Sequence, residues 1–172
     1  MAALELEIAQ LIREYHTRTG NWLTIGTVES ATGGRIADRI TNVPGSSDYF
    51  KGSVVAYSNE AKFDIVGVRK ETIENYGAVS SQTAIEMAQG GRKLLNVCVC
   101  ISDTGIAGPS GGSPKKPVGL FYLGLAVENE ALSREHIFSG NREENKEKAA
   151  EASLSMLKQH LLQCLSKSET SP

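Results

Sequence analysis

Cysteines are few in this sequence, and their spacing excludes two familiar uses of the thiol. Cys98 and Cys100 form a C-x-C inside an apolar run, and Cys164, the third and last cysteine, is remote from them. The chain therefore has no C-x-x-C redox motif and no second pair for a zinc site. We expect the cysteines to be buried free thiols.

An excess of one charge and a long apolar run are also missing. Lys and Arg total 18 and Asp and Glu total 20, so the net charge of -2 argues against nucleic acid or an anionic membrane as a partner. No apolar run approaches the ~20 residues that cross a bilayer. The opening segment MAALELEIAQLIREYH carries acids, and apolar residues at helical spacing, where a signal peptide carries bases. We expect a cytoplasmic protein.

The remaining composition and the order of the predicted elements indicate a single α/β domain. With 172 residues, 40% of them hydrophobic, the chain is large enough for one core. Strands interleaved with amphipathic helices predict a three-layer α/β/α sandwich with a mixed central sheet, in which ligands bind at strand ends and helix N-termini. Helices are predicted at 3–18, 35–40, 59–66, 70–76, 81–95 and 141–165, and strands at 22–28, 51–57, 96–102, 118–127 and 131–138. We expect a domain over residues 1–166 and a polar tail over 167–172.

The segment ESATGG, residues 29–34, is the first candidate for chemistry, because it joins a predicted strand to a helix. Its two glycines let the backbone approach a ligand closely, and N–H groups at the start of the helix can hold a phosphate or a developing oxyanion. Ser30 is placed like a nucleophile, although the segment is not the G-x-S-x-G elbow of hydrolases. On the pattern alone, a plain capping turn is the alternative.

The segment YSNEAK, residues 57–62, is the second candidate and again lies where a strand leads into a helix. A serine hydroxyl needs a base, and a lysine can serve when desolvation lowers its pKa. Ser58 and Lys62 are one helical turn apart, so both can face one pocket while Tyr57 closes its edge. The alternative for Lys62 is a solvated surface lysine.

Two further segments can bind an anion. The loop DTGIAGPSGG, residues 103–112, supplies hydroxyls, a carboxylate and many backbone donors, as phosphate and ribose sites do, but it lacks the order of a P-loop. Arg142, at the start of the last predicted helix, can pair with a phosphate. A flexible loop and an exposed arginine are the alternatives. None of the three histidines lies in a glycine-rich segment, so we expect neither a Ser-His-Asp triad nor a histidine metal site.

Four segments together resemble the C-terminal domain of the competence/damage-inducible protein CinA, over about residues 5–165. They are TVESATGG, PGSSDYFKGSVVAYSNEAK, TGIAGPSGG followed by KPVG, and GNR before the final helix. The resemblance implies an α/β/α amidohydrolase that converts nicotinamide mononucleotide (NMN) into nicotinate mononucleotide and ammonia without a metal or cofactor. It places the catalytic serine at Ser30, the lysine base at Lys62 and the family tyrosine at Tyr57.

The same resemblance supplies candidates for substrate binding and a homo-oligomeric state. The binding candidates are Thr32, Gly33, Gly34, Ser58, Asn59, Thr104, Gly105, Gly108 and Arg142, with the amides of residues 32–34 as candidates for the oxyanion hole. Position 31 is alanine where many members have cysteine, and position 141 is asparagine where aspartate is usual. The alternative function is a nucleotide-binding or regulatory module without catalysis. Metal-dependent pyrophosphate hydrolysis fits poorly, because no acidic cluster accompanies the glycine-rich loops.

Overall fold

Five strands form one mixed sheet with the spatial order β2-β1-β3-β4-β5. The structure is a computed structural model that describes residues 3–169. Strand β1 lies between β2 and β3 and is parallel to both. Strand β4 pairs antiparallel with both β3 and β5. The strands are β1 (Ile25–Glu29), β2 (Phe50–Val55), β3 (Val99–Gly105), β4 (Leu120–Ala126) and β5 (Ala131–Ile137).

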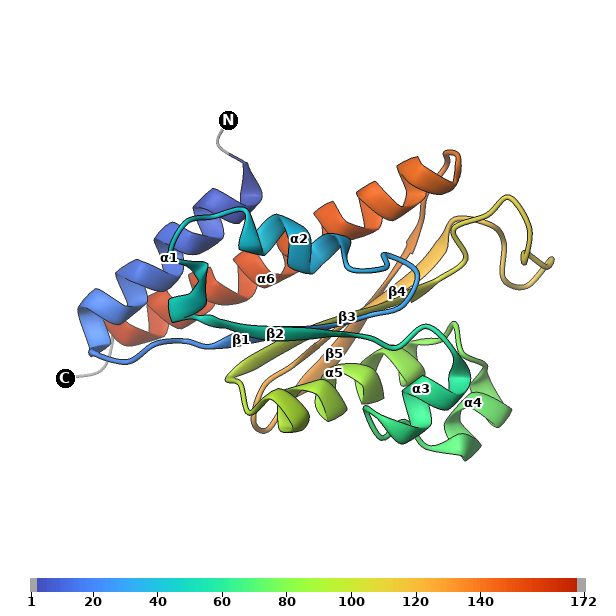
Figure 1. Ribbon diagram of the computed structural model, residues 1–172, viewed down its shortest axis with the longest axis horizontal. Helices are drawn as coiled ribbons and strands as arrows, with labels where there is room; N and C mark the ends of the chain where they lie inside the picture. The colour runs from blue at the N-terminus through green and yellow to red at the C-terminus, as the bar shows by residue number, and fades with distance from the viewer. Residues whose placement is uncertain (1–2, 170–172) are drawn as a thin grey trace.

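Helices cover both faces of this sheet (Figure 1). One layer contains α1 (Leu4–Thr19), α2 (Arg35–Thr41) and α6 (Arg142–Glu169), and the other contains α3 (Asn59–Asp64), α4 (Lys70–Tyr76) and α5 (Ser81–Leu95). A short 3-10 helix, η1 (Ser46–Asp48), precedes β2. The three-layer α/β/α sandwich with a mixed sheet in a single domain is therefore confirmed.

The central strand β3 has an apolar core on each face. Ile101 belongs to the larger cluster under α1, α2 and α6, and Cys100 belongs to the smaller cluster under α5. Successive residues of a strand point to opposite faces, which explains why the run NVCVCIS is almost wholly apolar. The cysteines differ from the expectation in one respect, since Cys100 is buried but Cys98 is exposed and Cys164 is half-buried.

Local sequence signals set the ends of several helices. Gly20 adopts the left-handed conformation that ends α1, and the Ser58 and Ser80 hydroxyls cap α3 and α5. Asn141 and Glu144 exchange side-chain and backbone hydrogen bonds at the start of α6, as in a capping box. In the part of the chain that the structure describes, no helix is both long and apolar enough to cross a membrane.

Most element boundaries differ from the prediction by a few residues, and two of the differences change the interpretation of a segment. Helix α6 continues to Glu169, past the expected end near residue 165, so part of the expected tail is helical and residues 170–172 lie outside the described residues. Strand β3 continues through Asp103 and Thr104 to Gly105, which the glycine content had assigned to a loop. Pairing of these residues with β4 keeps them extended. The second difference places Asp103 inside the sheet.

The topology produces a crevice at the carboxyl ends of the parallel strands. The chain leaves β1 through α2 to reach β2 on one side, and returns through α3, α4 and α5 to reach β3 on the other side of β1. The two connections cover opposite faces of the sheet (Figure 1). Ligands in open α/β sheets bind at such a switch point, and the segment that begins with Ser30 leaves β1 there.

Candidate active site

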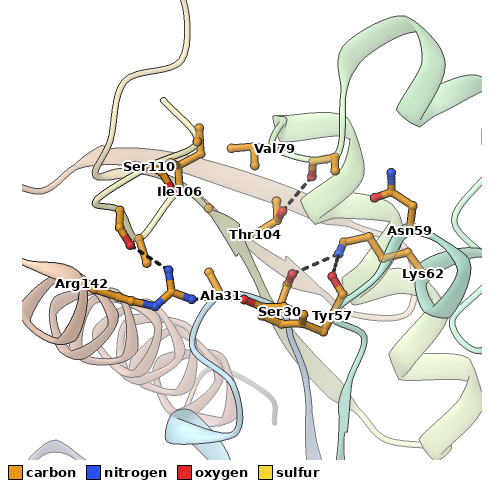
Figure 2. A pocket seen from close by; sticks show the side chains of 15 residues that line it. Ser30, Ala31, Tyr57, Asn59, Lys62, Val79, Thr104, Ile106, Ser110 and Arg142 are labelled. Carbon is orange, nitrogen blue, oxygen red and sulfur yellow. Dashed lines mark hydrogen bonds between the residues drawn. The ribbon is translucent and has the colours of Figure 1, made fainter. Parts of the chain in front are cut away.

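A pocket of about 260 Å³ lies at this crevice. It gathers segments that are far apart in the sequence, namely the end of β1, the start of α3, the turn before α5, the loop after β3 and the start of α6 (Figure 2). The residues discussed below that line it are Ser30, Ala31, Tyr57, Asn59, Lys62, Thr104, Gly105, Gly108 and Arg142.

The turn between β1 and α2 is organised by a buried carboxylate that sequence reasoning did not single out. Glu29 accepts hydrogen bonds from the amides of Gly34, Ile36 and Ala37 at 2.8–3.1 Å. It thereby caps α2 from the strand that precedes it. Gly33 and Gly34 have φ values of 66° and 100°, which other residues rarely adopt. The glycines and Glu29 together fix the direction in which the chain leaves Ser30.

A second buried carboxylate, which the sequence analysis had placed in a ligand-binding loop, lies across the sheet. Asp103 on β3 accepts hydrogen bonds from the amides of Ser30 at 3.0 Å and of Thr32 at 3.2 Å. The Thr32 hydroxyl lies within hydrogen-bonding distance of both Asp103 and Glu29. Burial raises the pKa of Asp103 to about 6, an effect that Glu29 reinforces and the bond from Thr32 opposes. The only signal in the sequence is an acidic residue at the end of an apolar strand.

Lys62 is not a surface lysine. Its side chain extends from α3 under the end of β2, the residue is 2% exposed, and its Nζ lies 3.0 Å from Ser30 Oγ (Figure 2). Nζ also lies 2.9 Å from the Ala56 carbonyl and 3.2 Å from the Tyr57 carbonyl. Two carbonyls match the two N–H groups of a neutral amine, which leaves its lone pair for the serine proton.

The environment of Lys62 favours the neutral amine that a general base requires. Burial lowers the pKa of Lys62 from its ordinary value, and the negative charge of Asp103 acts in the opposite direction. Ser30 is itself only 7% exposed, so the hydroxyl and the amine meet away from bulk water but at the wall of the pocket. The pair has the geometry of a nucleophile with its base.

Tyr57 connects the Ser30–Lys62 pair to Arg142, which lies on the other side of the pocket. The Arg142 guanidinium donates one hydrogen bond to the Tyr57 hydroxyl at 3.1 Å and another to the Gly108 carbonyl at 2.8 Å. Arg142 thereby links the segment after β2 to the loop after β3, although the three residues are far apart in the sequence (Figure 2). Both side chains are exposed, so a ligand can reach them.

The other expected binding residues divide into two groups. Asn59, Thr104, Gly105 and Gly108 line the pocket with the catalytic candidates, and Thr104 donates a hydrogen bond to the Ala78 carbonyl. The residues of the second group make hydrogen bonds that support the backbone; they are Ser58, Thr32, Gly33 and Gly34. The Ser58 hydroxyl caps α3, and the amides of residues 32–34 donate to Asp103, the Ser30 carbonyl and Glu29 respectively. These three amides are therefore not free for an oxyanion, which corrects that part of the expectation.

The fold and the pocket define a class of protein: an α/β/α domain with a Ser-Lys pair at the carboxyl ends of its parallel strands. Within residues 3–169, no group of three or more His, Cys, Asp or Glu side chains is arranged to hold a metal ion. Comparison with known proteins narrows the class to a family.

The chain belongs to the CinA C-terminal domain family, whose model matches residues 6–161. A CinA-like protein from Kosmotoga olearia is 46% identical over 160 residues, and one from Endomicrobium trichonymphae is 48% identical over 142 residues. These matches cover 93% and 83% of this chain but 37% and 34% of the relatives. The chain thus spans about a third of the length of these curated relatives.

Solved structures agree over almost the whole chain. The competence/damage inducible protein CihA from Agrobacterium tumefaciens is 36% identical with a TM-score of 0.82, covering 91% of this chain and 97% of that one. A competence or damage-inducible protein from Enterobacter asburiae is 32% identical with a TM-score of 0.84, covering 94% and 99%. Solved chains of similar extent therefore have this fold.

Proposed function

We propose that the protein is an amidohydrolase that cleaves the carboxamide of NMN, giving nicotinate mononucleotide and ammonia. The observation that carries the proposal is the contact of 3.0 Å between the Lys62 amine and the Ser30 hydroxyl. NMN is proposed as the substrate because the sequence resembles CinA domains of the NMN deamidase type, and the match to the CinA C-terminal domain family is consistent with that choice.

The reaction proceeds through an acyl-enzyme. Lys62 takes the proton of Ser30 as the serine oxygen bonds to the carboxamide carbon, and the carbonyl electrons move onto oxygen. When the tetrahedral intermediate collapses, its C–N bond breaks and the Lys62 ammonium returns the proton to the departing nitrogen, which leaves as ammonia. Water, deprotonated by the same amine, then cleaves the ester and restores the Ser30 hydroxyl.

The oxyanion requires a donor other than the amides of residues 32–34. The amide of Ala31 is the better candidate, because it follows the nucleophile directly and has no acceptor among the residues that the structure describes. The residue after the nucleophile has this task in α/β hydrolases. Alanine at position 31 retains the amide while offering no thiol, so the proposed chemistry does not involve a cysteine there.

Arg142 and the loop after β3 are proposed to hold the nucleotide phosphate. Arg142 has five N–H donors. One hydrogen bond to the Tyr57 hydroxyl and one to the Gly108 carbonyl occupy two of them, so donors remain for an anion. Thr104 and Asn59 provide further polar groups on the pocket wall. The phosphate-binding side and the Ser30–Lys62 side then lie at opposite rims of one pocket (Figure 2).

The test is to incubate the purified protein with NMN and to measure ammonia and nicotinate mononucleotide. Wild-type protein should release both in equal amounts, and Ser30→Ala should release neither while remaining folded. Ser153→Ala is the matched control, because this buried hydroxyl bonds only to the Ala149 carbonyl within α6 and should be dispensable. Binding of NMN without ammonia release would instead favour the nucleotide-binding module.

A further inference from the structure

The Asp103 carboxyl group connects the proposed nucleophile to the proposed base. It is fully buried on β3. One of its oxygens accepts a hydrogen bond from the Ser30 amide, and the other accepts one from the Thr32 amide. These bonds hold the first residues of the turn against the sheet. Asp103 is also the charged group whose field raises the pKa of Lys62 against the effect of burial. One side chain therefore acts on both members of the pair.

The neighbouring carboxylate, Glu29, has a different set of contacts. Its oxygens accept hydrogen bonds from three amides at the start of α2, including that of the N-cap Gly34, and from the hydroxyls of Thr27, Thr32 and Ser53. This arrangement anchors the helix. Thr32 contacts both acids with a single hydroxyl proton, so it can donate to only one of them at a time. The two acids are thus coupled through Thr32 but serve different elements.

We infer that Asp103 is a positioning residue, which holds Ser30 in the turn and stabilises the ammonium that Lys62 becomes when it takes the serine proton. The inference rests on the proposed Ser-Lys mechanism. Its physical basis is the role of the buried carboxylate in a Ser-His-Asp triad, which orients the base and stabilises the cation formed during attack. Here the Asp103 carboxylate acts on Lys62 through its negative charge, and it acts on Ser30 by accepting a hydrogen bond from the Ser30 amide.

The other charged groups near the pair do not duplicate this effect. From β1, Glu29 points into the start of α2, and from α6, Arg142 contacts Tyr57 and Gly108 at the outer rim. Lys146 of α6 reaches the exposed side of Gly33. The turn before α5 contributes the uncharged residues 78–79 to the pocket. Removal of the Asp103 charge should therefore shift the pKa of Lys62 downward.

The direct experiment is an NMR titration of Lys62, read from its ¹³Cε resonance in ¹³C-lysine protein without substrate. Asp103→Asn should lower the Lys62 midpoint by about one pKa unit, the lower end of the effect of a nearby opposite charge. Thr32→Val is the matched control, since it removes a buried hydroxyl beside Asp103 but leaves the carboxylate charged in the range where lysine titrates. Its Lys62 midpoint should stay at the wild-type value. An unchanged midpoint in folded Asp103→Asn would overturn the inference.

Kinetics with NMN give a second readout. Asp103→Asn should move the acid limb of the kcat/KM profile to lower pH and reduce the plateau kcat by about tenfold, the equivalent of one pKa unit if the ammonium is fully formed in the transition state. KM should change far less, because Asp103 does not line the pocket. Loss of kcat without movement of the acid limb would reduce Asp103 to a structural role.

The two proposals can fail separately. If wild-type protein releases no ammonia, the proposed function fails, while the NMR titration still decides whether Asp103 controls the protonation of Lys62. If Asp103→Asn does not fold, wild-type protein provides the test. The Asp103 ¹³Cγ resonance should then titrate with a midpoint near the pKa of about 6, and Lys62 ¹³Cε should show an inflection at the same pH. Absence of that shared inflection would contradict the coupling.

Discussion

Lys62→Met should abolish catalysis and change how stability depends on pH. The lysine is 2% exposed, and methionine has a similar length and no charge. The substitution removes the Lys62 amine, which contacts the Ser30 hydroxyl. It also leaves the Ala56 and Tyr57 carbonyls without the hydrogen bonds that this amine donates. An unsatisfied buried acceptor costs about 1–3 kcal/mol, whereas removal of Lys62 also removes the penalty that burial imposes on its charged form. The two contributions oppose each other, so pH is used to separate them.

The sign of the pH effect follows from the lowered pKa of Lys62. Between the folded-state pKa and the unfolded value near 10.4, the unfolded chain binds more protons than the folded protein. This site therefore makes wild-type protein more stable as pH rises through that interval. The penalty is complete below the folded-state pKa and vanishes above the unfolded value. Lys62→Met lacks this contribution at every pH.

Urea unfolding of both proteins between pH 7 and pH 10 measures the effect. The stability of Lys62→Met relative to wild type should be greatest at pH 7 and should decline as pH rises. The same preparations should lose about 10²–10⁴-fold in kcat for NMN, the usual contribution of a general base. Parallel stability profiles for the two proteins would show that Lys62 is not destabilised by burial, and the argument for a neutral amine would fail.

Three further changes test the rest of the site. Lys62→Arg keeps a cation that stays protonated, so it should lower kcat on the order of 10²-fold or more. Near wild-type activity would instead make Lys62 an electrostatic or binding residue, and Tyr57 would be the first group to test as the base. Tyr57→Phe removes the hydroxyl that accepts from Arg142, so it should raise KM for NMN by several-fold with a smaller change in kcat, and a loss confined to kcat would instead place Tyr57 in the chemistry. Activity should survive exhaustive treatment with a chelator, because no metal-ligand cluster occurs within the described chain, residues 3–169; a loss restored by one divalent ion would refute the Ser-Lys mechanism.

Much of the fold was predictable because its signals are local. Apolar residues at helical spacing predicted α1, and Gly20 ends this helix in the left-handed conformation that glycine adopts readily. Ser58 and Asn141 cap α3 and α6, as side chains within three residues of the amides that they satisfy. The error at the end of β3 has a tertiary cause, since pairing with β4 kept Gly105 extended despite the flexibility of glycine.

The candidate site was predictable only as separate segments. Ser30 and Lys62 were separate candidates, each where a predicted strand leads into a helix, and only the resemblance to a family joined them as a nucleophile and its base. Whether Lys62 was solvated or buried was left open, since no local pattern encodes burial of a charged side chain. Asp103 was assigned to a loop, and its bonds to the turn at Ser30 were not anticipated.

The elements, their order and the residue types available for catalysis follow from the amino-acid order, because they depend on contacts within a few residues along the chain. Which of those residues meet depends on the fold. Ser30 and Lys62 are separated by 32 positions and Ser30 and Asp103 by 73 positions, yet each pair is joined by one hydrogen bond. The low exposure of Ser30, Lys62 and Asp103 arises from packing against distant segments. Burial sets the pKa of the amine, so the proposed reactivity belongs to the folded arrangement and not to any segment.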